Sequence, residues 1–135
     1  MVERDKNIMS LDNFEKILKD AAPLASEICL HLMDEPLAHP KFAEILKICE
    51  KNKVQIQLTT NGLLLKKYQD ILISSKSLRQ INFSLQSYTD NFPNKDISGY
   101  LGCILDFCAK AAREAPSMYQ NLRLWNMEVA EGRNE

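Results

Sequence analysis

Four short stretches with a two-residue hydrophobic period constrain this chain most, because helical patterns separate them. The strand-like stretches are residues 27–33, 54–60, 81–87 and 121–127. The helical patterns before and between them are residues 10–22, 40–53, 64–75 and 99–114. Strands that alternate with helices of this length predict right-handed crossovers and one parallel sheet, and hence an α/β fold.

Each predicted strand has one aliphatic face and one largely polar face. The polar side chains expected to share a face are His31, Gln55, Gln57, Asn82, Ser84, Gln86 and Arg123. A parallel sheet covered by helices on both faces has strands that are almost continuously aliphatic. We therefore expect helices on one face only, with water, a ligand cavity or another chain against the polar face.

The wall of an open βα barrel, with a lumen that holds polar ligands, suits such a one-sided sheet. A closed eight-stranded barrel needs roughly 250 residues, whereas this chain has 135. We therefore expect an arc of about four parallel strands with flanking helices. A single domain is predicted over residues 1–135, with its core at 9–127 and a frayed tail at 128–135.

The charge balance and the N-terminus exclude several kinds of partner. Lys and Arg number 17 against 18 Asp and Glu, so no basic excess indicates nucleic-acid binding. No apolar run is long enough to span a bilayer, and residues 1–7 are too polar for a signal peptide. The sequence predicts a cytoplasmic protein with neither a nucleic-acid nor a membrane partner.

The four cysteines indicate free thiols and no metal site. Cys29, Cys49, Cys103 and Cys108 form neither a CxxC nor a CxxxCxxC motif. Structural zinc and iron–sulfur sites need clustered thiolates, so these cysteines are interpreted as small buried hydrophobic residues. No catalytic residue is predicted either, because the chain has no Ser-His-Asp set and no glycine-rich phosphate loop. His39, before Pro40, is expected to cap a helix.

Polar residues follow every predicted strand at its carboxyl end. They are Asp34-Glu35-Pro36, Thr59-Thr60-Asn61-Gly62, Gln86-Ser87 and Asn126. In parallel βα folds ligands bind beyond these ends of the strands. Asn-Gly and Glu-Pro are also ordinary turn sequences, so plain turns remain an alternative for each motif alone. All four together, beside a polar sheet face, favour a ligand site.

Residues 29–67 resemble the radical S-adenosylmethionine (SAM) superfamily. The motifs Glu35-Pro36-Leu37, His39-Pro40 and Thr60-Asn61-Gly62 occur in the order and at the spacing often found there. The strands that end near Gln86 and Asn126 resemble the continuation of that fold, so the resemblance covers roughly residues 10–127. It implies a partial TIM-like (βα)6 barrel that uses SAM and a [4Fe–4S] cluster to generate a 5′-deoxyadenosyl radical.

The resemblance also implies which residues would contact SAM. The segment Asp34, Glu35 and Pro36 would face the amino end of SAM, and Thr60 and Asn61 follow the next strand. The remaining positions of the implied site lie on later strands. Ser84 and Gln86 would face the ribose or carboxylate, and Arg123 and Asn126 a carboxylate or the substrate.

Two departures from the family pattern affect what is expected of this chain. The family holds its cluster with three cysteines of a CxxxCxxC loop, which this sequence lacks. Asp34 stands where the family usually has glycine, so its side chain would crowd a ligand near the backbone, although its charge would attract an ammonium group. We expect a truncated, split or degenerate radical SAM member that does not bind the cluster and is inactive alone.

Two other interpretations remain open from the sequence. One is a non-catalytic α/β binding or interaction module that uses the polar sheet face, and the other is a small α/β domain of a different kind. If the radical SAM interpretation holds, strands 27–33 and 121–127 are open sheet edges. Such edges predict self-association or a complementing chain.

Overall fold

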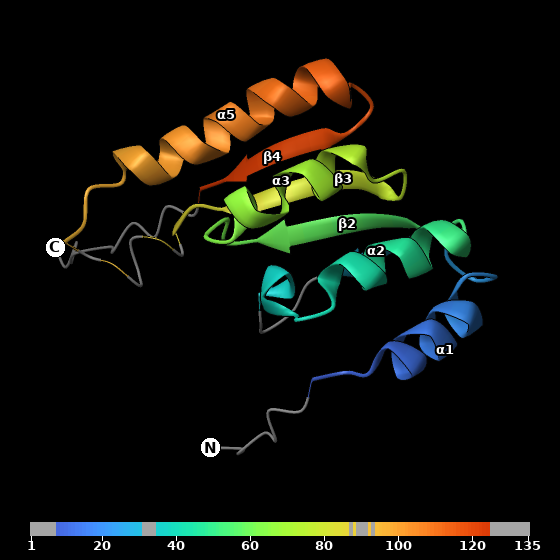
Figure 1. Cartoon of the computed structure of the whole chain (residues 1–135). Coiled ribbons are helices and arrows are strands. Elements are labelled where there is room, and N and C mark those ends of the chain that lie inside the picture. The colour runs from blue at the N-terminus through green and yellow to red at the C-terminus, as the bar shows by residue number, and fades with distance from the viewer. Residues whose placement is uncertain (1–7, 31–34, 87, 89–91, 93, 125–135) are drawn as a thin grey trace, which may run out of the picture.

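The computed structural model describes residues 8–30, 35–86, 88, 92 and 94–124 (Figure 1). Its helices are α1 (Leu11–Ala21), α2 (Phe42–Lys51), α3 (Leu65–Ser74) and α5 (Ser98–Glu114), with a 3-10 turn η1 (Pro36–Ala38). Its strands are β1 (Glu27–Leu30), β2 (Gln55–Thr60), β3 (Leu78–Ser84) and β4 (Tyr119–Arg123). Helices and strands alternate as predicted. The expected frayed tail at 128–135 lies outside the described residues.

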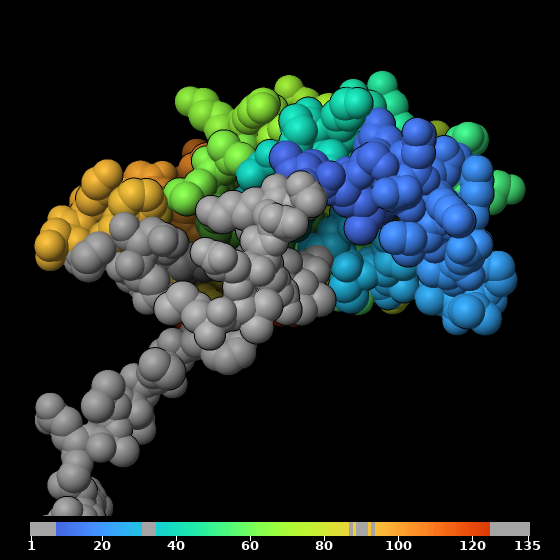
Figure 2. Space-filling model, turned by 90° about the horizontal axis from the view of Figure 1, so that it is seen from below, coloured from blue at the N-terminus to red at the C-terminus, as the bar shows by residue number. Residues whose placement is uncertain are grey.

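A side-chain cap marks the start of α1, and His39 lies just before α2. The Ser10 hydroxyl accepts a hydrogen bond from the Asn13 backbone N–H at 3.2 Å and so caps α1. His39 Nδ1 accepts from the Lys41 backbone N–H at 3.1 Å, but Lys41 precedes α2 and the helix itself has no side-chain cap, so the expectation that His39 caps it was wrong. His39 Nε2 lies 3.1 Å from the Met9 carbonyl oxygen and ties the two segments together. Figure 2 shows the N-terminal residues in blue against the cyan segment around His39.

The four strands form one sheet in the order β1-β2-β3-β4, and every neighbouring pair is parallel. This confirms the predicted α/β fold, with strands in sequence order and helical crossovers between them. In Figure 1, α2, α3 and α5 lie on the same side of the sheet. The sheet is open at β1 and β4 within the described residues, which agrees with an arc of a barrel wall.

The predicted bounds of the third and fourth strands were wrong. β3 begins at Leu78 and ends at Ser84, so Gln86 lies beyond the strand, and β4 begins at Tyr119. A register shift between Ile56 and Gln57 on β2 accounts for the irregular start of β3. Ile56 pairs with Leu78 and Gln57 with Gln80, so Arg79 is an extra residue that interrupts the alternating pattern.

The helix-covered face carries the hydrophobic core. Ile56, Leu58, Ile81 and Phe83 have no exposed surface, and the buried hydrophobic residues form one cluster. Edge-to-face ring contacts join Phe42 to Tyr68 and Phe83 to Phe107, with centroids 5.4 and 5.8 Å apart. Helices thus cover the aliphatic face predicted from the strand pattern.

Two leucines predicted on this covered face are exposed instead. Leu122 is 45% exposed and Leu124 is 74% exposed. Both belong to the last strand region of the described sheet, where no further described element packs over them. None of the described helices is both long enough and apolar enough to cross a membrane.

Candidate functional site

The face of the sheet opposite α2, α3 and α5 carries a ladder of polar side chains. The register places Gln57 beside Gln80, and it places Thr59 beside Asn82 and Asn82 beside Asn121. Strand alternation adds Gln55 to this face, and it adds Ser84 and Arg123, which pair directly across β3 and β4. The predicted polar face is therefore confirmed for these strand residues. His31 lies outside the described residues.

Asn82 is the centre of this ladder and is only 1% exposed. Its Oδ1 accepts hydrogen bonds from Gln80 Nε2 at 2.9 Å and from Asn121 Nδ2 at 3.0 Å. Its Nδ2 lies 3.4 Å from both the Leu58 carbonyl and Thr59 Oγ1. A buried amide with both ends satisfied aligns β2, β3 and β4. The site prediction omitted Asn82, although its place in the strand alternation had put it on the polar face.

Hydrogen bonds to the Glu35 carboxylate join the loop after β1 to the end of β2. Its Oε1 accepts hydrogen bonds from the Leu37 N–H at 3.1 Å and from the Thr60 hydroxyl at 2.6 Å. Its Oε2 accepts from the Asn61 N–H at 2.7 Å. Glu35 therefore caps η1 and also fixes the carboxyl end of the neighbouring strand. The sequence motifs show that Glu35 and Thr60-Asn61 follow neighbouring strands, but not that they bind each other.

The Asn61-Gly62 turn, predicted from its sequence, is closed by its own side chains. Thr60 Oγ1 accepts from the Gly62 N–H at 3.0 Å, and Asn61 Oδ1 accepts from the Leu63 N–H at 2.9 Å. Gly62 has φ of 75°, in the left-handed region that glycine tolerates best. A Cβ at this position would lie 3.2 Å from Cδ1 of Ile104, so α5 also packs against the turn.

Tyr100 holds the same turn from the α5 side. Its hydroxyl donates a hydrogen bond to the Asn61 carbonyl at 2.6 Å. Its ring stacks on Tyr88, with centroids 4.4 Å apart and planes 17° from parallel. Burial, then the Glu35 carboxylate and then Tyr88, raise the pKa of Tyr100 to about 12. Sequence reasoning missed Tyr100, although it starts the buried stripe of α5 that continues through Ile104 and Phe107.

The residues predicted to contact SAM fall into two groups. Glu35, Thr60 and Asn61 meet at the ends of β1 and β2, next to Pro36 in the first turn of η1. Thr60, however, points to the covered side, and Thr59 takes the polar face.

The second group lies on β3 and β4. Ser84 and Arg123 are register partners at the carboxyl ends of these strands. Gln86 follows β3, after the strand has ended. Asp34 and Asn126 lie outside the described residues. Whether these residues bind SAM stays a prediction, but the two groups share the edge of the sheet where a ligand was expected.

The cysteines do not fit a [4Fe–4S] cluster. Cys29 is exposed on β1, Cys49 is buried in α2, and Cys103 and Cys108 belong to α5. Burial, followed by the charge of Glu50, raises the pKa of Cys49 to about 12, which opposes the thiolate that iron requires. No group of three or more His, Cys, Asp or Glu side chains in the described ranges could hold a metal ion.

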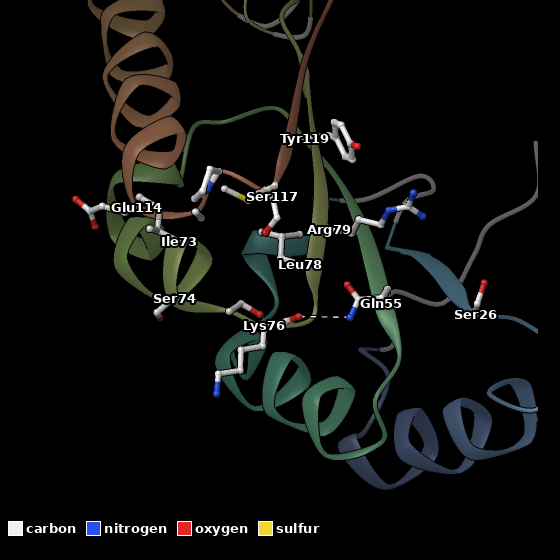
Figure 3. Close-up of a pocket in the computed structure, with 14 residues that line it drawn as sticks. Ser26, Gln55, Ile73, Ser74, Lys76, Leu78, Arg79, Glu114, Ser117 and Tyr119 are labelled. Atoms are coloured by element: carbon white, nitrogen blue, oxygen red, sulfur yellow. Dashed lines mark hydrogen bonds between the residues drawn. The ribbon is translucent and has the colours of Figure 1, made fainter.

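An open groove of about 700 Å³ lies at the opposite, amino end of the strands (Figure 3). Gln55 Nε2 donates to the Lys76 carbonyl across it at 3.4 Å, and Arg79 is already paired with Glu27 at 3.0 Å. The amino ends of strands in parallel βα folds usually serve stability and not ligand binding. We therefore place the candidate site at the carboxyl ends of the strands and not in this groove.

Comparison with known families identifies the class of protein that this fold and site represent. The model described as "Radical SAM superfamily" matches residues 1–118, and the chain therefore belongs to the radical SAM superfamily. Members of this family use SAM and a [4Fe–4S] cluster. A search among curated proteins finds no match to the chain.

Two solved structures have a similar fold. SuiB of Streptococcus suis, bound to precursor peptide SuiA, is 19% identical, with a TM-score of 0.64 over 88% of this chain and 27% of SuiB. An archaeal TYW1 is 17% identical, with a TM-score of 0.54 over 93% of this chain and 50% of TYW1. The chain thus spans about a quarter and a half of these proteins, and at such identities the similarity concerns the fold alone.

Proposed function

We propose that this chain forms the SAM-binding wall of a radical SAM enzyme and that the cysteines which hold the cluster are supplied from outside these 135 residues. Family membership supports SAM as the ligand. The scattered cysteines support an external source for the cluster, so no redox step is assigned to this chain. Its own residues bind and orient SAM, and by itself it is inactive.

The charges along the carboxyl ends of the strands carry this proposal. Glu35 lies at the β1–β2 end and Arg123 at the β4 end, with Ser84 beside Arg123. The methionyl part of SAM is a zwitterion, with an ammonium group and a carboxylate. An ammonium near Glu35 and a carboxylate near Ser84 and Arg123 would match these charges, because guanidinium and hydroxyl groups are good carboxylate donors.

Calorimetric titration of the full chain with SAM and with 5′-methylthioadenosine, which lacks the methionyl ammonium and carboxylate, tests this. We expect Arg123→Gln to weaken SAM binding about tenfold, as expected when a charge-assisted hydrogen bond is lost. Binding of 5′-methylthioadenosine should not change. Arg79→Gln, at the opposite end of the sheet, is the matched control and should leave both affinities unchanged. If the unaltered chain binds neither compound, the alternative of a non-catalytic interaction module is favoured.

The exposed edge at β4 supports a second proposal, that a complementing chain or a second copy pairs with the sheet. Tyr119, Leu122 and Leu124 are 61, 45 and 74% exposed on or next to this edge strand. Unpaired edge strands with apolar side chains favour association, and a charge on the edge opposes it. We expect light scattering to detect self-association that Leu122→Lys reduces. A monodisperse monomer before substitution would contradict pairing with a second copy and leave a complementing chain as the partner.

We further propose that the chain acts in the cytoplasm, where its four free cysteines remain reduced. Fractionation of the cells that express it, with a thiol-labelling reagent applied at lysis, would test this. Recovery in the soluble fraction with four labelled thiols is expected, whereas oxidised cysteines in a secreted fraction would contradict it.

A further inference from the structure

The backbone of Asn61 is held at both its N–H and its carbonyl by side chains from distant parts of the chain. Glu35 Oε2 accepts from its N–H at 2.7 Å, and the Tyr100 hydroxyl donates to its carbonyl at 2.6 Å. Its side-chain Oδ1 accepts from the Leu63 N–H. Among the described residues, Nδ2 is thus the polar group of Asn61 that makes no hydrogen bond. An amide nitrogen of this kind can only donate.

Tyr100 is itself fixed in place and is not a mobile surface tyrosine. Its side chain is buried in the core cluster, and its ring stacks on Tyr88. One turn further along α5, Ile104 packs against Gly62. The hydroxyl therefore approaches the turn from a rigid helix, whereas the carboxylate of Glu35 approaches it from the loop after β1.

We propose that Tyr100 is a positioning residue, which directs Asn61 Nδ2 toward an acceptor oxygen of the methionyl part of SAM. This inference rests on the proposed function, because it places Asn61 at the same ligand. Tyr100 does not touch SAM. Its hydroxyl sets the tilt of the Asn61–Gly62 peptide, and that tilt sets the direction of the Asn61 side chain.

Two conservative substitutions and their combination test the inference. Tyr100→Phe removes only the hydroxyl, and Asn61→Asp keeps the oxygen that caps Leu63 while it removes the Nδ2 donor. Each should weaken SAM binding, Tyr100→Phe about fivefold, as expected for one neutral hydrogen bond. Because one residue acts through the other, the double variant should bind SAM about as weakly as Asn61→Asp alone.

The controls separate positioning from a general effect on the fold. Tyr88→Phe removes a hydroxyl from the same ring stack, one that donates to the Asp96 carbonyl, and it should leave SAM affinity unchanged. Binding of 5′-methylthioadenosine should be equal for all variants. In the ligand-free protein, Tyr100→Phe should shift the Gly62 amide nitrogen resonance, because the Asn61 carbonyl belongs to the same peptide group.

Each other outcome overturns the inference. Unchanged SAM affinity in Tyr100→Phe, equal losses for SAM and 5′-methylthioadenosine, or additive losses in the double variant would each show that Tyr100 does not act through Asn61. Failure of the unaltered chain to bind SAM would instead refute the proposed function, and this inference with it. The Gly62 amide resonance reports the hydrogen bond between Tyr100 and the Asn61 carbonyl without any ligand. It therefore separates a failure of this inference from a failure of the proposed function.

Discussion

The two faces of the sheet are stabilised by different interactions. On the covered face, Leu58 and Phe83 have no exposed surface and pack with the helices in one hydrophobic cluster. On the polar face, Asn82 is equally buried, but it is held by amide hydrogen bonds from Gln80 and Asn121. Burial of a large aliphatic side chain contributes several kcal/mol, whereas one hydrogen bond contributes about 1 kcal/mol net. The covered face therefore supplies most of the stability, and the polar face aligns the strands.

Substitution on the covered face of β2 should cause the largest loss of stability. Leu58→Ala should lower the free energy of unfolding by about 2–5 kcal/mol, because it leaves a cavity in the core. Its neighbour Gln57 is half-buried on the opposite face, and Gln57→Ala should cost less than about 1 kcal/mol. Urea unfolding followed by circular dichroism measures both. Similar losses for the two variants would refute the contrast between the faces.

A smaller effect is expected at the centre of the polar face. Asn82→Ala should cost about 1–3 kcal/mol, because the Gln80 and Asn121 amides lose their shared acceptor in a buried place. Ser84→Ala, two residues along the same face, is the matched control and should cost less. If both cost the same in urea unfolding, the ladder centred on Asn82 does not align the strands as described.

Alkaline pH should affect the covered side through Tyr100. Its pKa is raised from 10 to about 12, so the folded state keeps a proton that the unfolded state loses first. The stability due to this group is complete below pH 10 and is lost as the pH rises toward 12. Between pH 10 and 12, the free energy of unfolding should fall less steeply with pH for Tyr100→Phe than for the unaltered protein. Parallel pH profiles for the two proteins would contradict the buried position of the hydroxyl.

The smallest effect should come from the ion pair at the amino end of the sheet. Arg79 and Glu27 lie 3.0 Å apart, with side chains 53% and 19% exposed. Exposed pairs contribute about 0–1 kcal/mol, so Arg79→Gln should cost no more than that, and less in high salt. A salt-independent loss above this range would mean that this end of the polar face is as important for stability as the core.

The sequence predicted the order of the elements and the covered face well, because both depend on hydrophobic period alone. It failed at the start of β3, because the extra residue Arg79 breaks that period and the shift depends on pairing with β2. It also failed for the exposure of Leu122 and Leu124. Alternation gives the face of a residue but not whether another element covers it.

The candidate site was predicted less completely than the fold. Glu35, Thr60 and Asn61 were chosen correctly as residues near one another, because polar residues at the ends of neighbouring parallel strands must lie at one edge. Their mutual hydrogen bonds were not predicted, since these depend on the path of η1. Tyr100 was missed because it lies 39 residues beyond Asn61, and no local pattern links a helix tyrosine to a distant carbonyl.

The bond between Glu35 and Asn61 also has a consequence for the order of folding. It joins residues 26 positions apart and closes a loop that contains α2 and β2. The cost of loop closure rises with loop length, and paired residues lie 28 positions apart in β1 and β2, 22 or 23 in β2 and β3, and 39 in β3 and β4, so we expect β1 to β3 with their helices to form as one unit before β4 adds. We expect the Asn61 amide to exchange its hydrogen only when this whole unit opens, and Glu35→Ala to slow the refolding of the chain.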